Sequence, residues 1–233
     1  MANTEMQQTT AFLATYLSSR HVPPTSAWLQ TLVPTLRLNI PMVALQKTAL
    51  FRLLATDLMV SIDKSQVSTF PVGITDPGAR EKRLRSFITV QILDIEDIGR
   101  SRWSQVDAIE AHERGETTKG REIIRVIPDE NDVGTTLNSS ADASHGPHKL
   151  LLQDARGTRV YGLELFSIPG IDTSTSIGAK LVLKDCVVAR GIILLEPKNV
   201  EVLGGKIESW DKQWRNNQKS VLKEKAGIRE NAA

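Results

Sequence analysis

The chain has 233 residues, of which 40% are hydrophobic and 24% charged, a composition typical of an ordinary folded protein. Its net charge at pH 7 is only +2, which argues against a protein whose main work is to hold nucleic acid by its phosphates. A chain of this length builds one large domain or two small ones, and we expect two.

Sorting signals and cysteine usage lead us to expect an intracellular protein. No apolar run approaches the roughly 18 residues that a membrane span requires, and the first twenty residues lack the order of segments in a signal peptide. Cys186 is the only cysteine, so no internal disulfide can form. Its strand-like, valine-rich context predicts a small core residue, because no neighbouring histidine could activate it as a nucleophile.

Residues 1–62 predict an amino-terminal domain of three short helices. Pro23 and Pro24 end the first helix, Thr25 or Ser26 can cap the second, and Pro34 stops it. Pro41 opens the third helix. The apolar stripes that we expect to face the core are Phe12, Leu13, Tyr16 and Leu17, then Trp28, Leu29, Leu32 and Val33, then Val43, Leu50, Phe51, Leu54 and Leu58.

A second domain, residues 63–233, begins with a polar segment and a basic cluster. Residues 61–79 are rich in Ser, Thr, Pro and Gly, which predicts a linker that wraps the edge of the domain. The cluster that follows predicts either a solvated strand entry or a weak contact with DNA phosphates, and it could also serve as a nuclear address. Its cations are Arg80, Lys82, Arg83 and Arg85.

Three strands are expected before residue 166. In the first, Ile88, Val90 and Ile92 alternate with polar residues and Ile95 continues in the opposite phase, which indicates a bulge in a curved strand. The second is found at residues 149–152. After the turn at residues 154–157 comes a third strand, whose inward row we expect to be Tyr161, Leu163 and Leu165.

Residues 178–205 predict two further strands with a bend at Asp185, a glycine interruption at Gly191 and a turn at residues 197–199. Ala179, Leu181 and Leu183 form the inward row. The alternation places Lys180 and Lys184 outward. Five short, bent strands in this order indicate a small β-barrel of the oligonucleotide-binding fold (OB-fold). The fold class is therefore α+β, a three-helix bundle followed by a five-stranded barrel.

An amphipathic helix is expected at about residues 207–226. Trp210, Trp214 and Val221 recur at helical spacing in a segment rich in Lys and Arg. We expect the two tryptophans to pack on the barrel, and contact with a partner protein is the alternative.

Between the first two strands lies an insertion, residues 99–147, far longer than the roughly dozen residues of an ordinary loop. Its middle and end are polar and rich in Gly and Ser, as disordered segments are. We predict that its apolar residues anchor it in a partner's pocket. For residues 123–127, a simple extension of the barrel sheet is equally consistent with the sequence. The candidate anchors are Trp103, Val106, Ile109, Ile123 and Ile124.

Catalytic and metal-binding patterns are absent from the sequence. His145 and His148 share a Gly-Pro loop without cysteines or organised carboxylates, so we predict no metal site. No phosphate-binding glycine loop and no nucleophile elbow is present, and no carboxylates are paired for acid/base work. We therefore expect neither enzymatic activity nor a cofactor, and no small-molecule substrate.

Residues 178–205 also resemble the RecQ-mediated genome instability protein 1 family, whose pattern includes Lys180, Arg190, Gly191, Pro197 and Asn199. Further matching residues are Leu194, Leu195, Val200, Val202, Leu203, Gly204 and Gly205. The helical start resembles the family more loosely. That family supplies the OB-fold subunit of topoisomerase III complexes. We expect a short form without a second OB-fold.

The resemblance implies a non-catalytic nuclear scaffold that binds topoisomerase III and works with a RecQ-family helicase to dissolve double Holliday junctions, with DNA contacted inside the complex. We assign docking on the topoisomerase to Lys180, Lys184 and Arg190, with a solvated lysine as the alternative for Lys180. In the family, an insertion at this place reaches the topoisomerase gate. The insertion sequence itself matches poorly, so its location carries over better than its residues.

Two other functions remain open. A free-standing single-strand binder needs aromatic platforms among basic residues. Phe87, Tyr161 and Phe166 are the only barrel aromatics, and we place Tyr161 inward, which favours the scaffold. The other alternative is an adaptor for different partners.

Overall fold

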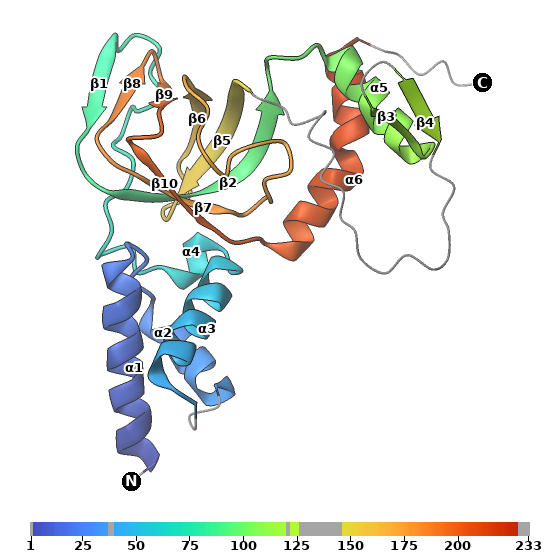
Figure 1. Cartoon of the computed structure of the whole chain (residues 1–233). Helices are drawn as coiled ribbons and strands as arrows, with labels where there is room; N and C mark the ends of the chain where they lie inside the picture. The colour runs from blue at the N-terminus through green and yellow to red at the C-terminus, as the bar shows by residue number, and fades with distance from the viewer. Residues whose placement is uncertain (1, 37–39, 120–121, 126–145, 228–233) are drawn as a thin grey trace.

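The computed structural model describes residues 2–36, 40–119, 122–125 and 146–227. It consists of a helical unit below a curled β-sheet, with a long helix beside the sheet in the view of Figure 1. No helix within these residues has the length and apolar character to span a membrane.

The helical unit contains α1 (Ala2–Ser19), α2 (Ser26–Leu32), the 3₁₀ turn η1 (Val33–Thr35), α3 (Met42–Leu54) and α4 (Leu58–Ser61). Thr25 caps α2, since its hydroxyl oxygen accepts a hydrogen bond from the Trp28 backbone N–H at 3.1 Å. Trp28 packs against the core of the unit, as predicted.

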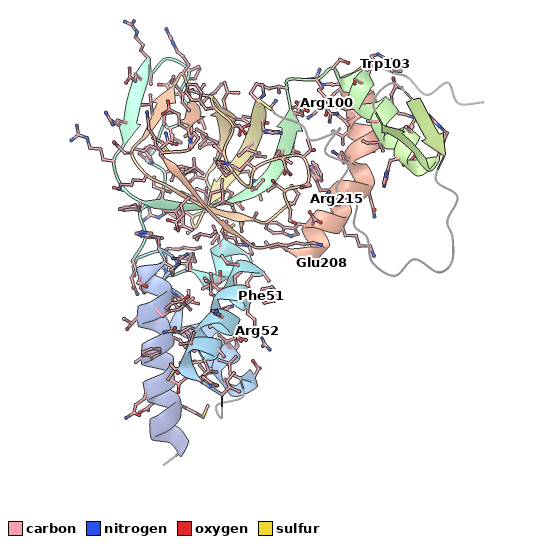
Figure 2. The ribbon with its side chains drawn as sticks, viewed as in Figure 1. Phe51, Arg52, Arg100, Trp103, Glu208 and Arg215 are labelled. Carbon is pink, nitrogen blue, oxygen red and sulfur yellow. The ribbon has the colours of Figure 1, made fainter. Side chains whose placement is uncertain are left out.

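The buried face of α3 differs from our prediction. Leu45, Ala49 and Leu53 point into the core at helical spacing. Val43 is exposed, and Phe51 is 73% exposed and points away from the unit (Figure 2). The predicted stripe followed the neighbouring face of the helix and so omitted Leu45, Ala49 and Leu53, whereas Leu54 and Leu58, which it included, are buried.

The barrel strands form one sheet in the order β1-β8-β9-β6-β5-β2-β7-β10. Their bounds are β1 (Glu81–Leu84), β2 (Ile88–Asp97), β5 (His148–Asp154), β6 (Arg159–Glu164), β7 (Lys180–Leu183), β8 (Cys186–Ala189), β9 (Ile192–Leu195) and β10 (Val200–Gly204). β2 lies in the first predicted strand, β5 in the second and β6 in the third, and β7 to β10 lie in the predicted stretch 178–205, with the turn at residues 197–199 between β9 and β10. The α+β class with an OB-fold barrel is confirmed.

The predicted bulge in the first strand is confirmed. The register of β2 against β5 shifts between Ile92 and Asp94, so Ile92 and Ile95 both face the core across the shift.

The predicted phase of the third strand is wrong. Val160, Gly162 and Glu164 are its inward residues, and Tyr161 is 48% exposed. A Cβ added at Gly162 would lie 2.8 Å from Leu195 Cδ1, so a larger residue at this inward position would require Leu195 to shift. Glu164 is buried because its carboxylate accepts hydrogen bonds from the backbone N–H of Ile168 at 2.7 Å and of His148 at 3.0 Å.

Residues 63–79 form a strap across the barrel, in agreement with the prediction of a wrapping linker. Phe70 and Ile74 are buried in the barrel core. The Phe70 backbone N–H donates to Asp154 Oδ2 at 2.8 Å. At Gly191, which has a φ of 81°, an added Cβ would lie 2.5 Å from the carbonyl oxygen of Thr75, so the strap lies directly on this glycine.

The terminal helix, α6 (Glu208–Lys225), lies beside the barrel (Figure 1). Trp210 and Trp214 pack against the barrel core, and the Trp214 indole N–H donates to Asp94 Oδ1 at 2.7 Å. The prediction that the tryptophans pack on the barrel is confirmed.

The insertion forms α5 (Arg102–Glu113) and a separate two-stranded sheet of β3 (Glu116–Lys119) and β4 (Glu122–Arg125). Ile123 and Ile124 pair with Thr118 and Thr117 in this small sheet, so β4 does not extend the barrel sheet. Val126, Ile127 and the polar end of the insertion up to His145 lie outside the described residues.

Candidate partner-docking surfaces

The outer side of β6, β9 and β8 carries a row of half-buried and exposed apolar side chains, which we call the docking face. Tyr161 pairs with Ile192, Leu163 with Leu194, and Leu194 with Val187, so these side chains point to the same side of the sheet. Just after β6, Leu165 is exposed and Phe166 is 66% exposed. Apolar patches of this kind on a protein surface mark interaction sites. Sequence reasoning missed this face because it placed the third strand in the wrong phase.

Lys180 does not lie on any surface, which corrects our prediction. Its side chain is 0% exposed, and its ammonium group donates to the carbonyl oxygen of Gly178 at 2.6 Å. Burial lowers its pKa to about 7, and the nearby Asp57 carboxylate opposes that shift. A fully buried lysine cannot contact a docking partner.

The helical unit covers the barrel at Lys180, and a network of polar side chains connects the two. Gln91, the cross-strand partner of Lys180, donates to Asp57 Oδ1 at 2.7 Å and to Gln153 Oε1 at 2.9 Å. Its own side-chain oxygen accepts from the Leu58 backbone N–H at 3.0 Å. Lys180 therefore belongs to the junction where α4 meets the barrel. The alternation placed Lys180 outward correctly, but no pattern within the strand indicates that α4 covers it.

The other predicted cations meet at one edge of the sheet. Because β1 pairs with β8, the cluster of Arg80, Lys82, Arg83 and Arg85 lies near Lys184 and Arg190, and all six are exposed. Charged side chains on an end strand such as β1 also protect it from pairing with other chains, which is the purely structural interpretation.

Three of these six cations already have partners. Arg83 binds Asp185 through two hydrogen bonds of 2.7 and 2.5 Å, which raises the pKa of Arg83 and lowers the pKa of Asp185. Arg190 donates to the Pro77 carbonyl at 3.2 Å and so holds the strap. The Lys184 ammonium lies 5.2 Å from the centre of the Phe87 ring, which stacks on His21 at 4.2 Å.

The base of the insertion is held by Glu96, a buried carboxylate that sequence reasoning did not single out. Its oxygens lie 2.8 Å from Lys149 Nζ, 3.0 Å from Arg102 Nη2 and 3.3 Å from Lys225 Nζ. Burial alone would raise the pKa of Glu96, but the hydrogen bonds from Lys149 and Arg102 and the charge of Lys225 outweigh it and lower the pKa to about 2. Glu96 thus ties together β5, the start of α5 and the end of α6.

Only one of the predicted insertion anchors is seen to be well exposed. Trp103 is 56% exposed in the first turn of α5 (Figure 2). Val106 is buried and Ile109 is half-buried, where α5 packs on α6, so Val106 is not available to a partner. Lys219 bridges Glu110 and Glu113 across these helices at 3.3 and 2.6 Å. For Ile123 and Ile124, the structure describes the backbone alone.

Within the described part of the chain, no three His, Cys, Asp or Glu side chains gather as a metal site would require. His145 lies outside that part. His148 is buried, with its Nδ1 atom 2.5 Å from Glu164 Oε2. Nothing in the spacing of these two residues pointed to the pair. Cys186 is buried, and burial raises its pKa to about 11, in keeping with the predicted core role.

Comparison with known proteins places this architecture in a family. Residues 62–218 match the N-terminal OB-fold domain of RMI1, and residues 17–59 match the N-terminal helical domain of RMI1. RecQ-mediated genome instability protein 1 of Schizosaccharomyces pombe is 31% identical over 227 residues, which cover 90% of this chain and 92% of that protein.

Two vertebrate relatives of the same name are longer. The Xenopus laevis protein is 27% identical over 218 residues, covering 92% of this chain but 36% of its own length. The Mus musculus protein is 28% identical over 144 residues, covering 60% of this chain and 21% of its own length. The chain thus corresponds to about a third of the frog protein and to nearly all of the fission yeast protein. It belongs to the RecQ-mediated genome instability protein 1 family.

Proposed function

We propose that this chain is a non-catalytic nuclear scaffold that binds topoisomerase III, modulates its DNA gate and, together with a RecQ-family helicase, promotes decatenation and the dissolution of double Holliday junctions. The names of its relatives support a place in a RecQ-linked genome-stability pathway. The single observation that carries the scaffold role is the docking face, because an apolar sheet surface exposed to water is stabilised by a protein partner.

Docking is assigned to the paired, exposed side chains of Tyr161 and Ile192 on this face, and to Phe166, which is exposed just after β6. Aromatic and aliphatic side chains that become fully desolvated contribute most of the energy of a protein interface. Lys184 and Arg190 remain candidates for its charged rim, where cations affect association rate and specificity more than affinity. The insertion module, with Trp103 exposed on α5, is the element proposed to act at the gate.

Tyr161→Arg is expected to weaken the capture of topoisomerase III about 30-fold, equivalent to about 2 kcal/mol, because it replaces an exposed aromatic side chain of the docking face with a charged one. Capture is measured by pull-down with purified topoisomerase III over a range of concentrations. Tyr161 is half exposed, so the unfolding transition should change little.

Two variants serve as controls. Val43→Arg changes another exposed apolar residue, on the helical unit, and should leave capture unchanged. Trp103→Ala should retain capture but reduce decatenation of single-stranded linked circles. If Tyr161→Arg binds topoisomerase III as tightly as the unaltered protein, the docking face is not the interface.

A single-strand binding function is the second candidate, and the exposure of Tyr161 and Phe166 favours it more than the sequence did. The basic edge would hold the phosphates. Phe87, however, is covered by His21 on one side and approached by Lys184, which limits stacking with a base. If the protein is a scaffold, the isolated chain should bind an oligothymidine only weakly, and the affinity should fall as the salt concentration rises. Nanomolar binding at roughly 0.2 M salt would instead favour the single-strand binding function.

A further inference from the structure

The outer half of α5 lies beside α6 and is held there by ion pairs (Figure 1). Lys219 Nζ lies 3.3 Å from Glu110 Oε1 and 2.6 Å from Glu113 Oε2. Lys223 Nζ lies 3.1 Å from the same Glu110 oxygen. We call these four side chains the ionic latch. The two cations are one turn apart on α6 and the two carboxylates are one turn apart on α5, so opposite charges face each other along the contact.

Apolar packing adds little to this contact. Val106 is the buried hydrophobic residue of α5, and Ile109 is half-buried. Val106 belongs to neither the barrel core nor the core of the helical unit. One valine buries a small apolar area compared with a domain core, so the position of the outer half depends on the ionic latch.

The ionic latch is open to water and therefore weak. Its side chains are between 23% and 54% exposed. Hydrogen bonds from Lys223 and Lys219 lower the pKa of Glu110, and those to Glu113 and Glu110 raise the pKa of Lys219, so the latch is charged at neutral pH. Ion pairs with this exposure contribute little to stability, and salt screens them.

The inner end of α5 is held more firmly. Arg102 donates to the carboxylate of Glu96 at 3.0 Å, and that carboxylate is only 6% exposed. Gln105 is buried and donates to the carbonyl oxygens of Asp97 and Arg100 at 2.9 and 3.1 Å. Salt screens buried contacts much less than exposed ones. The outer half of α5 should therefore separate from α6 before the inner end does.

We infer that α5 is a releasable element of the fold. The ionic latch keeps its outer half on α6, and this half separates from α6, while α6 and the barrel stay folded, when the latch charges are screened or displaced. Trp103, Val106 and Ile109 recur every third residue along one side of α5. The closed contact covers the last two, and release exposes them. Their use by a partner rests on the proposed role of the insertion, whereas the release is a property of the isolated chain.

Thiol labelling at position 106 measures the release directly. Cys186 is the only cysteine of the chain and is 0% exposed. Val106→Cys therefore introduces a thiol that should react with the neutral reagent N-ethylmaleimide only when α5 leaves α6. Labelling of Cys186 in the same molecule reports opening of the barrel. Trp103→Cys, at an exposed position of the same helix, gives the rate without protection.

Salt and charge reversal should both speed the labelling of the Val106→Cys chain. Raising NaCl from about 0.05 to 0.5 M shortens the Debye length from about 14 to about 4 Å, so labelling should become about three- to tenfold faster. Lys219→Glu replaces the shared cation of the latch with a third carboxylate. It should speed labelling at least about tenfold at low salt and remove most of the salt dependence.

Reversing the charges on both helices separates ionic attraction from packing. Reversal on one helix should open the contact, and reversal on both should return labelling to within about threefold of the original rate. The changes are Glu110→Lys with Glu113→Lys on α5, and Lys219→Glu with Lys223→Glu on α6. Lys212→Glu is the matched control, because it lies seven residues before Lys219 on the same side of α6. It should change labelling less than about twofold.

Hydrogen exchange repeats the salt comparison with Val106 intact, in case the cysteine itself loosens the contact. A 12-residue helix is marginal in water once it is released, so the α5 amides should exchange faster at high salt.

Three outcomes would overturn the inference. The first is labelling and amide exchange that neither salt nor charge reversal changes. The second is labelling of the fourfold variant that stays as fast as with one helix reversed, which would mean that packing of Val106 holds α5. The third is equal labelling of Cys186 and of position 106 in every chain, which would mean global unfolding. Topoisomerase III is absent from these measurements, so none of these outcomes bears on the proposed scaffold role.

Discussion

Lys180→Glu is expected to lower the free energy of unfolding by about 3 to 5 kcal/mol, whereas Lys180→Met should be neutral or stabilising. Glutamate would bury a second carboxylate near Asp57 in a position that is 0% exposed. Methionine keeps most of the aliphatic stem and removes the cost of burying an amine. Urea denaturation followed by circular dichroism measures both changes.

The same lysine makes stability depend on pH. Its pKa is about 7 in the folded chain, against an ordinary value of 10.5. Between these values the unfolded chain binds more protons than the folded one, so the stability contributed at this position rises with pH. Below pH 7 both states are protonated and the full burial cost remains. The gain from pH 7 to 10.5 is at most about 4 to 5 kcal/mol, at 1.36 kcal/mol per pKa unit.

Comparison with Lys180→Met isolates this effect, because all other titrating groups are shared. The unfolding free energy of the unaltered protein should rise relative to that of this variant as pH increases above 7. Lys184→Glu, an exposed change on the same stretch of chain, should alter stability by less than about 1 kcal/mol. If the difference between the unaltered protein and Lys180→Met stayed constant from pH 7 to 10.5, the folded amine would have an ordinary pKa and the burial argument would be wrong.

Glu96→Gln is expected to cost about 2 to 3 kcal/mol at pH 7, because it leaves the cations of Lys149, Arg102 and Lys225 without their shared carboxylate. The folded pKa of Glu96 is lowered to about 2 from 4.5, so its stabilisation is present above pH 4.5 and lost as pH falls toward 2. Unfolding by urea at pH 7 and pH 3 measures this, and hydrogen exchange should report faster opening of α5.

Glu208→Gln is the matched control. Glu208 forms a 3.0 Å ion pair with Lys206 on the open surface of α6 (Figure 2), where such pairs contribute at most about 1 kcal/mol. If Glu96→Gln and Glu208→Gln lowered the free energy of unfolding by the same amount, Glu96 would not hold the base of the insertion.

Local patterns predicted the elements of the fold well. The cap at Thr25, the bulge after Ile92 and the packing of Trp210 and Trp214 each depend on spacing along one segment, and each is confirmed. The site was harder to predict because side-chain environments depend on what distant segments cover.

Three residues illustrate the limit. Lys180 alternates like an outward residue, yet α4, more than a hundred residues earlier in the chain, covers it. Tyr161 was counted as inward because large apolar residues usually face a core, whereas Gly162 and Glu164 hold the inward positions here. The charge on Glu164 is tolerated only because His148 and two backbone N–H groups meet it, and none of these contacts can be read from one strand.

The order of strand pairing has a consequence for synthesis on the ribosome. The helical unit is complete early, but β2 pairs with β5 and β7, and β1 with β8, all of which come later in the chain. Roughly fifty residues separate the end of β2 from the start of β5, which at 5 to 20 residues per second delays the first barrel pairing by about 3 to 10 s. For that time the nascent chain presents an unpaired, strongly apolar strand, so its yield in cells should depend on chaperones that shield the growing polypeptide.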